Sequence, residues 1–294
     1  MNICAAIFAH NEERRIGSCL KSLPLDRMDI AFHVLVNGSN DRTADRARLA
    51  AGGRANVHIH ELHPGGKSRT WNRFVFGMEG KRHDVVIFMD GDAEIKTGSI
   101  DALAATLAMH PHANAASGMP LSGRNHLVYQ AELRKERGLF GGLYAVRGDF
   151  LRRMHERNIR LPEDLIGDDG LIAALAATDL RGDAYWDRER VEPCEAAGFY
   201  CEPAELLNPV TMRIQYRRMI NYSVRRYQNQ IISRVMQNEG PTGLPARLAQ
   251  LYSAHLPSFT IRPSPALAWF DYQALRRIRR AAEFSPPAPP LPPQ

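Results

Sequence analysis

Uninterrupted apolar runs alternate with stretches of helical periodicity along the first third of the chain. Ile3–Ala9 and Val85–Met89 are apolar at every position. Such runs are typical of parallel strands in a sheet that helices cover on both faces. His33–Val36 and Val57–Glu61 are predicted as two further strands between them.

The segments between these strands carry apolar residues at the spacing of amphipathic helices. The helices predicted here cover Arg14–Leu23, Thr43–Ala51, Lys67–Met78 and a segment that begins at Ser99, whose side chain can cap it. Strands and helices thus alternate. This order favours an α/β fold with a mostly parallel central sheet flanked by helices.

The pattern becomes less regular after the fourth helix. Further helices are predicted at Leu127–Leu139, Asp149–Arg157, Asp168–Thr178, Met212–Gln237 and Ala266–Phe284. Further strands are predicted at Leu143–Val146, Ala184–Trp186 and Gly198–Cys201. These elements predict an α/β domain at 1–209, a basic helical C-terminal extension at 210–284 and a proline-rich disordered tail at 285–294.

Charge is distributed unevenly over the 294 residues, which carry a net charge of +6. Residues 210–294 contain twelve arginines, no lysine and three acidic residues, so this segment carries +9 and residues 1–209 carry −3. A basic end on a slightly acidic body predicts contact with an anionic partner. A solvated helix face is the alternative.

The last predicted helix combines apolar residues with four arginines, Arg276, Arg277, Arg279 and Arg280. Two interpretations stay open for it. Either its apolar residues pack on the rest of the protein, or the helix makes a peripheral contact with an anionic membrane. No nucleic acid partner is expected.

Other features of the sequence favour a cytoplasmic protein. No apolar run reaches the roughly 18 residues that a membrane-spanning helix needs. The four cysteines form no close pair, and we expect them to be reduced. If the membrane interpretation of the last helix holds, the protein would lie at the inner membrane face.

Asp90-Gly91-Asp92 follows the apolar run Val85–Met89 directly. Ligands of open α/β sheets bind where the parallel strands end. Two carboxylates separated by one glycine can face a common hard cation without a side chain in the way, and oxygen ligands suit Mg2+ or Mn2+. Such a metal would bridge a diphosphate and neutralise its charge as it departs.

Five segments occur in an order that is characteristic of one enzyme family. They are Ala5–Glu13, Val34–Thr43, Gly65–Asn72, Asp90–Asp92 and Leu161–Leu171. With these segments the chain resembles the family 2 glycosyltransferases, inverting enzymes with the GT-A fold, over roughly residues 1–180. The resemblance implies a GT-A-like, Rossmann-like α/β domain.

The resemblance also implies roles for single residues of this sequence. The turn after the first strand would contact the nucleoside, and Asn37 takes the place of an aspartate that contacts the base. Lys67 would contact phosphate or sugar at a helix start, and Arg218 lies in a partial match to a segment that contacts the diphosphate. The implied donor-binding residues are Ala9, Asn11, Glu12, Asn37, Lys67, Asp90 and Arg218, and the implied metal ligands are Asp90 and Asp92.

The acidic pair Asp168-Asp169 matches the family's segment that carries the catalytic base. Asp169 is implied as the base that takes the proton of the acceptor hydroxyl, with Asp168 as its neighbour. Both open a predicted helix, whose N-terminus favours ionised carboxylates. Glu163 and Asp164 are the competing pair, and helix capping alone is the alternative role for either pair.

The implied reaction is the transfer of a sugar from a nucleotide-sugar donor to an acceptor hydroxyl, with inversion and with Mg2+ or Mn2+. A UDP-sugar is favoured as the donor, and the acceptor would be a saccharide or a lipid-linked molecule. A sugar-nucleotide nucleotidyltransferase is one alternative, although the turn after the first strand lacks the glycine-rich basic loop that such enzymes need. The other is a non-catalytic binding protein that uses the basic C-terminal segment.

Overall fold

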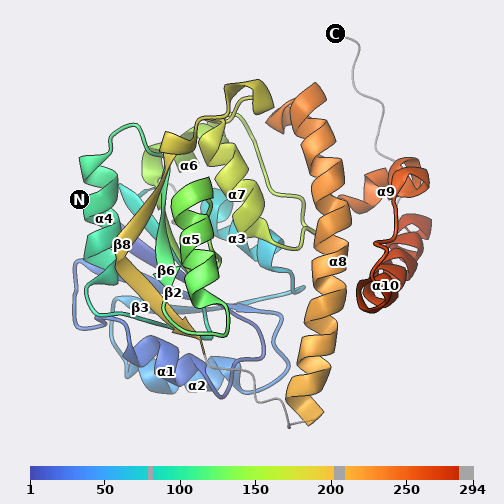
Figure 1. Ribbon diagram of the computed structural model, residues 1–294. Helices are drawn as coiled ribbons and strands as arrows, with labels where there is room; N and C mark the ends of the chain where they lie inside the picture. Colours follow the sequence, from blue (N-terminus) through green and yellow to red (C-terminus); the bar gives the residue numbers. More distant parts are fainter. Residues whose placement is uncertain (79–81, 202–208, 285–294) are drawn as a thin grey trace.

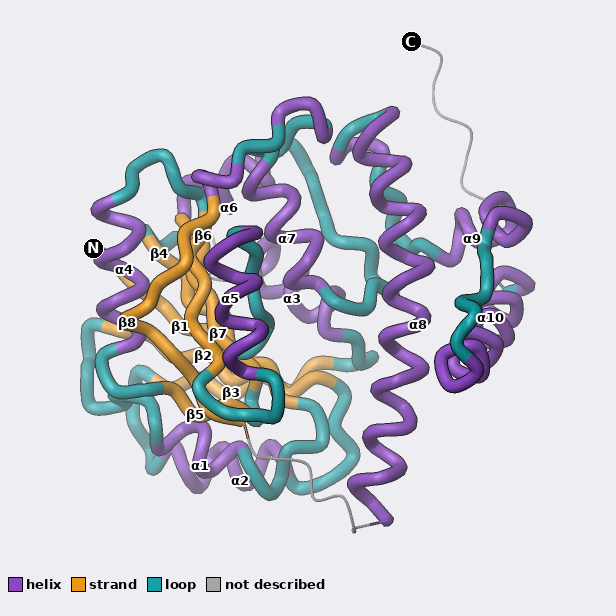
Figure 2. Tube along the Cα trace, viewed as in Figure 1, coloured by secondary structure: helices purple, strands orange, loops and turns teal. Residues whose placement is uncertain are grey.

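Eight strands form one mixed sheet within residues 1–78, 82–201 and 209–284, which are the residues that the computed structural model describes. The strands are β1 (Ile3–Ala9), β2 (Ile30–Asn37), β3 (Val57–Leu62), β4 (Val85–Asp90), β5 (Ala93–Ile95), β6 (Ala115–Pro120), β7 (Leu143–Arg147) and β8 (Val191–Cys201). Their order across the sheet is β3-β2-β1-β4-β7-β6-β8-β5. Figure 2 shows the strands in orange, with helices around them.

The half of the sheet that contains β1 to β4 is parallel, as the apolar runs predict. β1 lies between β2 and β4, with Ile3 opposite both Ile30 and Val85, and with Phe8 opposite Asp90. The other half is mixed, since β7 runs antiparallel to β4 and β6, and β5 runs antiparallel to β8. The parallel half brings the carboxyl ends of β1 and β4 to the same edge of the sheet.

Helices cover both faces of this sheet, which confirms the predicted fold class (Figure 1). On one face, α1 (Ile16–Lys21), α2 (Thr43–Ala51) and α4 (Ser99–Met109) contribute to one hydrophobic cluster. On the other, α3 (Lys67–Gly77), α6 (Gly148–Glu156) and α7 (Asp168–Ala177) contribute to a second. α5 (His126–Glu136) connects β6 to β7.

The C-terminal helices share the second of these clusters. α8 (Pro209–Asn238) contributes Tyr227, α9 (Ala249–His255) contributes Tyr252 and α10 (Pro265–Glu283) contributes Ile278. In Figure 1, α8 stands beside the sheet domain, and α10 packs on α8. The predicted division between 1–209 and 210–284 stays a prediction, with buried residues of one cluster on both sides of it. Among the described residues, no helix has both the length and the hydropathy to cross a bilayer.

Two local predictions are wrong. The segment Ala184–Trp186 is not a strand but overlaps a 3-10 helix, Asp183–Tyr185, none of whose residues is buried, so no sheet holds it extended. Ser99 does not cap α4, because Gly98 is the N-cap and the Ser99 hydroxyl instead donates to the carbonyl oxygen of Gly198. The predicted tail at 285–294 lies outside the described residues.

Gly148 begins α6 where the chain leaves the sheet, and a Cβ atom there would fall on the backbone carbonyl oxygen of His83. Because a backbone atom cannot swing aside, we expect Gly148→Ala to lower the free energy of unfolding by roughly 1–3 kcal/mol, as measured by urea denaturation. Gly17→Ala in α1 is the matched control, since a Cβ there meets nothing within 4 Å. The control should keep its stability or gain up to ~1 kcal/mol. Equal stability of the two variants would contradict the close approach at Gly148.

Candidate active site

The turn Asp90-Gly91-Asp92 packs directly against the end of β1. The backbone N–H of Gly91 donates to the carbonyl oxygen of Phe8 over 2.7 Å, and a Cβ at Gly91 would lie 2.9 Å from the Cβ of Ala9. Packing against β1 therefore requires glycine at position 91, independently of any need to leave a cation access to the two carboxylates. Ala9, which was predicted to contact the nucleoside, thus packs against the Asp-Gly-Asp turn at the edge of the sheet where β1 and β4 end.

Cationic side chains pair with both carboxylates of the turn. Lys67 Nζ, at the start of α3, lies 2.7 Å from Asp90 Oδ1. Asp92 Oδ2 lies 3.3 Å from a guanidinium nitrogen of Arg15 and 3.9 Å from one of Arg218, which comes from α8. The structure thus brings Lys67 and Arg218 to the predicted edge, where both contact carboxylates. Their contacts with a donor stay predictions.

Glu12 adds a third carboxylate to this edge. Its Oε2 lies 2.6 Å from Arg15. Burial, together with the nearby Asp92, raises the pKa of Glu12 to about 7. Burial also raises the pKa of Asp90 to about 6, with Lys67 opposing the shift and Asp92 adding to it. Burial therefore disfavours the ionised form of these carboxylates, and a further cation at the edge would favour it.

Asp168 and Asp169 open α7 and lie at the same edge. Asp168 is 4% exposed, its Oδ1 lies 3.5 Å from Lys67 Nζ, and its Oδ2 finds no hydrogen-bond partner among the described residues. Burial raises the pKa of Asp168, and Lys67 opposes that shift. Asp169 Oδ1 lies 3.1 Å from Arg225 of α8. One ammonium group, that of Lys67, therefore links the Asp-Gly-Asp turn to the acidic pair.

Gly141 lies over the middle of this edge, in the loop between α5 and β7. A Cβ at this position would lie 3.2 Å from Lys67 Nζ, 3.5 Å from Asp90 Oδ2 and 3.9 Å from Asp169 Oδ2. The space beside Gly141 is thus close to carboxylates from both acidic motifs. It exists because this residue has no side chain.

The turns after β1 and β2 hold each other through side chains. Asn11 has a left-handed backbone with φ of +56°, its N–H donates to Ser39 Oγ, and its Oδ1 accepts from the N–H of Asn40, both over 3.0 Å. The side-chain oxygen of Asn37 accepts from the N–H of Gly66 over 2.7 Å. That oxygen is engaged within the protein, and the contact of Asn37 with a nucleotide base stays a prediction.

The competing acidic pair, Glu163 and Asp164, has structural partners. The Asp164 carboxylate accepts from the backbone N–H groups of Leu248 and Ala249, over 2.7 and 2.9 Å, at the start of α9. Glu163 pairs with Arg69 over 3.0 Å. Asp164 therefore holds α9 in place.

Three residues contribute to the edge without having been assigned from the sequence: Arg15, Gly141 and Arg225. Arg225 occupies the space that a Cβ at Gly167 would need, so the glycine before the acidic pair makes room for it. Arg225 also follows Arg218 by two helical turns, a spacing that places both on one helix face. For Arg15, the signal is its position three residues after an acidic residue, which suits an ion pair.

The donor atoms at this edge suit a hard divalent cation. Asp90 and Asp92 offer carboxylate oxygens, which Mg2+ and Mn2+ prefer. Within the described residues, no three histidine, cysteine or acidic side chains are grouped so that they hold an ion by themselves. This agrees with the usual binding of Mg2+, which uses one or two carboxylates together with the phosphates of a substrate.

Solved structures with a similar fold include two that match this chain over 96% of its length. One is a mannosyltransferase from Pyrobaculum calidifontis in complex with GDP-Man and Mn2+, with 16% identity and a TM-score of 0.58 over 96% of this chain and 86% of that chain. The other is TarS 1-349 from S. aureus in complex with UDP, with 14% identity and a TM-score of 0.52 over 96% of this chain and 90% of that chain. These similarities show the GT-A type of fold.

Sequence comparison identifies the family. A curated relative, 4,4'-diaponeurosporenoate glycosyltransferase of Staphylococcus haemolyticus (strain JCSC1435), is 28% identical over 134 residues, which cover 44% of this chain and 33% of the relative. The sequence model described as glycosyl transferase family 2 matches residues 4–163. This match includes the turn after β1, the start of α3 and the Asp-Gly-Asp turn. The chain belongs to glycosyl transferase family 2.

Proposed function

We propose that this protein transfers a sugar from a nucleoside diphosphate sugar to an acceptor hydroxyl, with inversion at the anomeric carbon. One observation carries the proposal: Lys67 lies 2.7 Å from Asp90 of the metal motif and 3.5 Å from Asp168 of the acidic pair. In this proposal, the groups for donor binding and for acceptor activation lie at one edge of the sheet. Membership of glycosyl transferase family 2 supports the reaction class.

The donor nucleotide would lie along the turns after β1 and β2, with its diphosphate toward Asp90 and Asp92. Arg15 and Arg218 already place two guanidinium groups beside Asp92, and guanidinium groups suit diphosphate oxygens. Both UDP-sugars and GDP-sugars are donors to test, since UDP and GDP-Man are bound in the similar structures.

Asp169 would take the proton of the acceptor hydroxyl as its oxygen attacks the anomeric carbon. Arg225, 3.1 Å away, orients that carboxylate, and Lys67 holds the neighbouring Asp168. When bound at Asp90 and Asp92, Mg2+ or Mn2+ would neutralise the charge on the departing nucleoside diphosphate. Attack from the side opposite to the leaving group inverts the anomeric carbon.

Product analysis separates this proposal from its two alternatives. With a panel of UDP-sugars and GDP-sugars, the proposed transferase releases a nucleoside diphosphate. A sugar-nucleotide nucleotidyltransferase would release pyrophosphate, and a non-catalytic binding protein would release neither.

Asp92→Asn removes one negative charge from the proposed cation site and keeps the size of the side chain. We expect it to reduce transfer at least roughly a hundredfold. It should also abolish the rise in Tm that Mn2+ and UDP or GDP produce together, since a ligand of the folded protein stabilises it. Glu94→Gln, at an exposed position of β5, is the matched control and should retain both properties. If chelation and Asp92→Asn both leave transfer unchanged, the metal role is wrong.

Asp169→Asn tests the base. The variant should keep the Tm rise with Mn2+ and nucleotide, while kcat falls by roughly a hundredfold or more, because proton removal is lost and binding is not. Asp164→Asn makes the same charge change at a residue that holds α9, so it should lower Tm and leave the kcat of the folded protein close to wild type. The reverse pattern would assign the base to the other acidic pair.

A further inference from the structure

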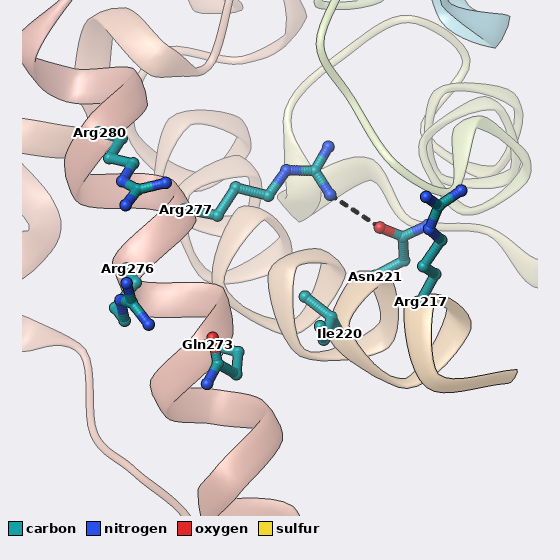
Figure 3. Close-up of a pocket in the computed structure, with 7 residues that line it drawn as sticks. All are labelled: Arg217, Ile220, Asn221, Gln273, Arg276, Arg277 and Arg280. Atoms are coloured by element: carbon teal, nitrogen blue, oxygen red, sulfur yellow. Dashed lines mark hydrogen bonds between the residues drawn. The ribbon is translucent and has the colours of Figure 1, made fainter. Parts of the chain in front are cut away.

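A pocket with a volume of about 640 Å³ lies between α8 and α10 (Figure 3). Side chains of both helices line it, and most of them are hydrogen-bond donors. Those used below are Arg217 and Asn221 of α8 and Gln273, Arg276, Arg277 and Arg280 of α10. We call this the arginine pocket.

The four arginines of the pocket form no ion pair with any acidic side chain in the described part of the chain. Other arginines of α8 do have such partners: Arg225 pairs with Asp169, and Arg226 lies 3.8 Å from Asp271. Four guanidinium groups that have no counter-charge among the described residues repel one another, so an anion that enters the pocket would be stabilised. The planar guanidinium group matches the geometry of phosphate in particular.

Hydrogen bonds hold the walls of this pocket in place. Arg277 reaches across from α10 and donates to Asn221 Oδ1 over 2.8 Å, as the dashed line in Figure 3 shows. In the second turn of α10, the fully buried Asp271 accepts from Arg262 over 2.6 Å, and Arg262 also donates to Ser223 of α8 over 2.9 Å. Because α10 is fixed on α8, a ligand would meet a pocket that is already formed.

Exposed aromatic side chains adjoin the pocket on the same two helices. Tyr216, Trp269 and Tyr272 are 42%, 52% and 45% exposed. Trp269 Nε1 donates to Tyr216 Oη over 3.2 Å, and the rings of Trp269 and Tyr272 lie 6.2 Å apart. The guanidinium carbon of Arg276 lies 6.0 Å from the ring centroid of Tyr272. The aromatic cluster and the arginine pocket therefore form one continuous surface.

The sequence leaves two interpretations of α10 open, packing on the protein and contact with a membrane. Different residues of α10 fit each of them. Leu275 and Ile278 are buried against the protein, as packing predicts. Trp269 and Tyr272 lie on the exposed side of α10, and its pocket arginines, Arg276, Arg277 and Arg280, are exposed too. The buried residues attach the helix, and the exposed ones are available to a partner.

We propose that this surface binds an anionic lipid membrane. In this proposal the arginine pocket takes a headgroup phosphate, and the three aromatic rings lie between headgroups and acyl chains. Tyrosine and tryptophan favour that region because each combines an apolar ring with a polar atom. Inorganic phosphate would use the arginines and would gain nothing from the rings, whereas an anionic lipid uses both features.

The double variant Arg276→Gln/Arg280→Gln tests the pocket, because both side chains are exposed and lack ion-pair partners among the described residues. Arg247→Gln/Arg279→Gln is the matched control, with the same loss of charge at exposed arginines outside the pocket. Both are compared with the wild type in co-sedimentation with phosphatidylcholine vesicles, with and without phosphatidylglycerol. We expect wild type to bind only the anionic vesicles. The pocket variant should lose roughly thirtyfold in partition coefficient, and the control much less.

If the two double variants lose the same amount of vesicle binding, the pocket is not the binding site. Attraction by net charge alone would affect both variants equally, because each lacks two arginines. Binding of the wild type to neutral vesicles alone, or to no vesicles at low salt, would also overturn the proposal.

A second measurement distinguishes a lipid from free phosphate. In a Trp186→Phe background, Trp269 is the exposed tryptophan, since Trp71 is buried. Its emission should shift to shorter wavelength with anionic vesicles and should not shift with inorganic phosphate. If inorganic phosphate raises the Tm of wild type but not of Arg276→Gln/Arg280→Gln, and vesicles produce no shift, the pocket serves a soluble phosphate and the membrane proposal is wrong. Neither measurement depends on sugar transfer, so each stands apart from the proposed function.

Discussion

The ammonium group of Lys67 lies between two carboxylates from distant parts of the chain, and the candidate site is organised around it. Without this cation, Asp90 and Asp168 would be two poorly solvated negative charges at one edge, which is strongly unfavourable. Burial alone would lower the pKa of Lys67, but Asp168 and Asp90 hold it well above its usual value. Its position depends in turn on the end of β2, since the side-chain oxygen of Asn37 accepts a hydrogen bond from the N–H of Gly66, the residue before α3. A hydrogen bond between the end of β2 and the N-cap of α3 thus helps to position the central charge.

The parallel half of the fold was predictable because its strands are buried on both faces and therefore apolar throughout. Ile3–Ala9 and Val85–Met89 carry that signal, and the end of the second run places Asp90 and Asp92 at the ligand-binding edge. The predicted helices Met212–Gln237 and Ala266–Phe284 correspond to α8 and α10. β6 carries no comparable signal, because Ala115–Pro120 consists largely of small residues with a glycine and a terminal proline. Its neighbours in the sheet hold it extended.

The side chains that contact the site residues could not be predicted from the sequence, for a different reason. The motifs place Asp90, Asp168 and Asp169 in one region, but which cation faces which carboxylate depends on how helices pack. Arg225 reaches Asp169 because α8 crosses the start of α7 beside Gly167, a contact between segments far apart in the chain. The capping of α9 by Asp164 is likewise a tertiary contact, and it gives a structural role to an acid that the sequence alone leaves as a rival base.

Because Gly91 packs so closely on β1, the residues of the Asp-Gly-Asp turn are under two different evolutionary constraints. Catalysis would demand the two aspartates, whereas folding demands the glycine, because Phe8 and Ala9 leave no room for a side chain. After a gene duplication, a copy released from catalysis would be free to replace Asp90 and Asp92 but would still be held to glycine between them. In such a lineage, the middle residue of the motif would mark common ancestry, and its flanking residues would mark surviving activity.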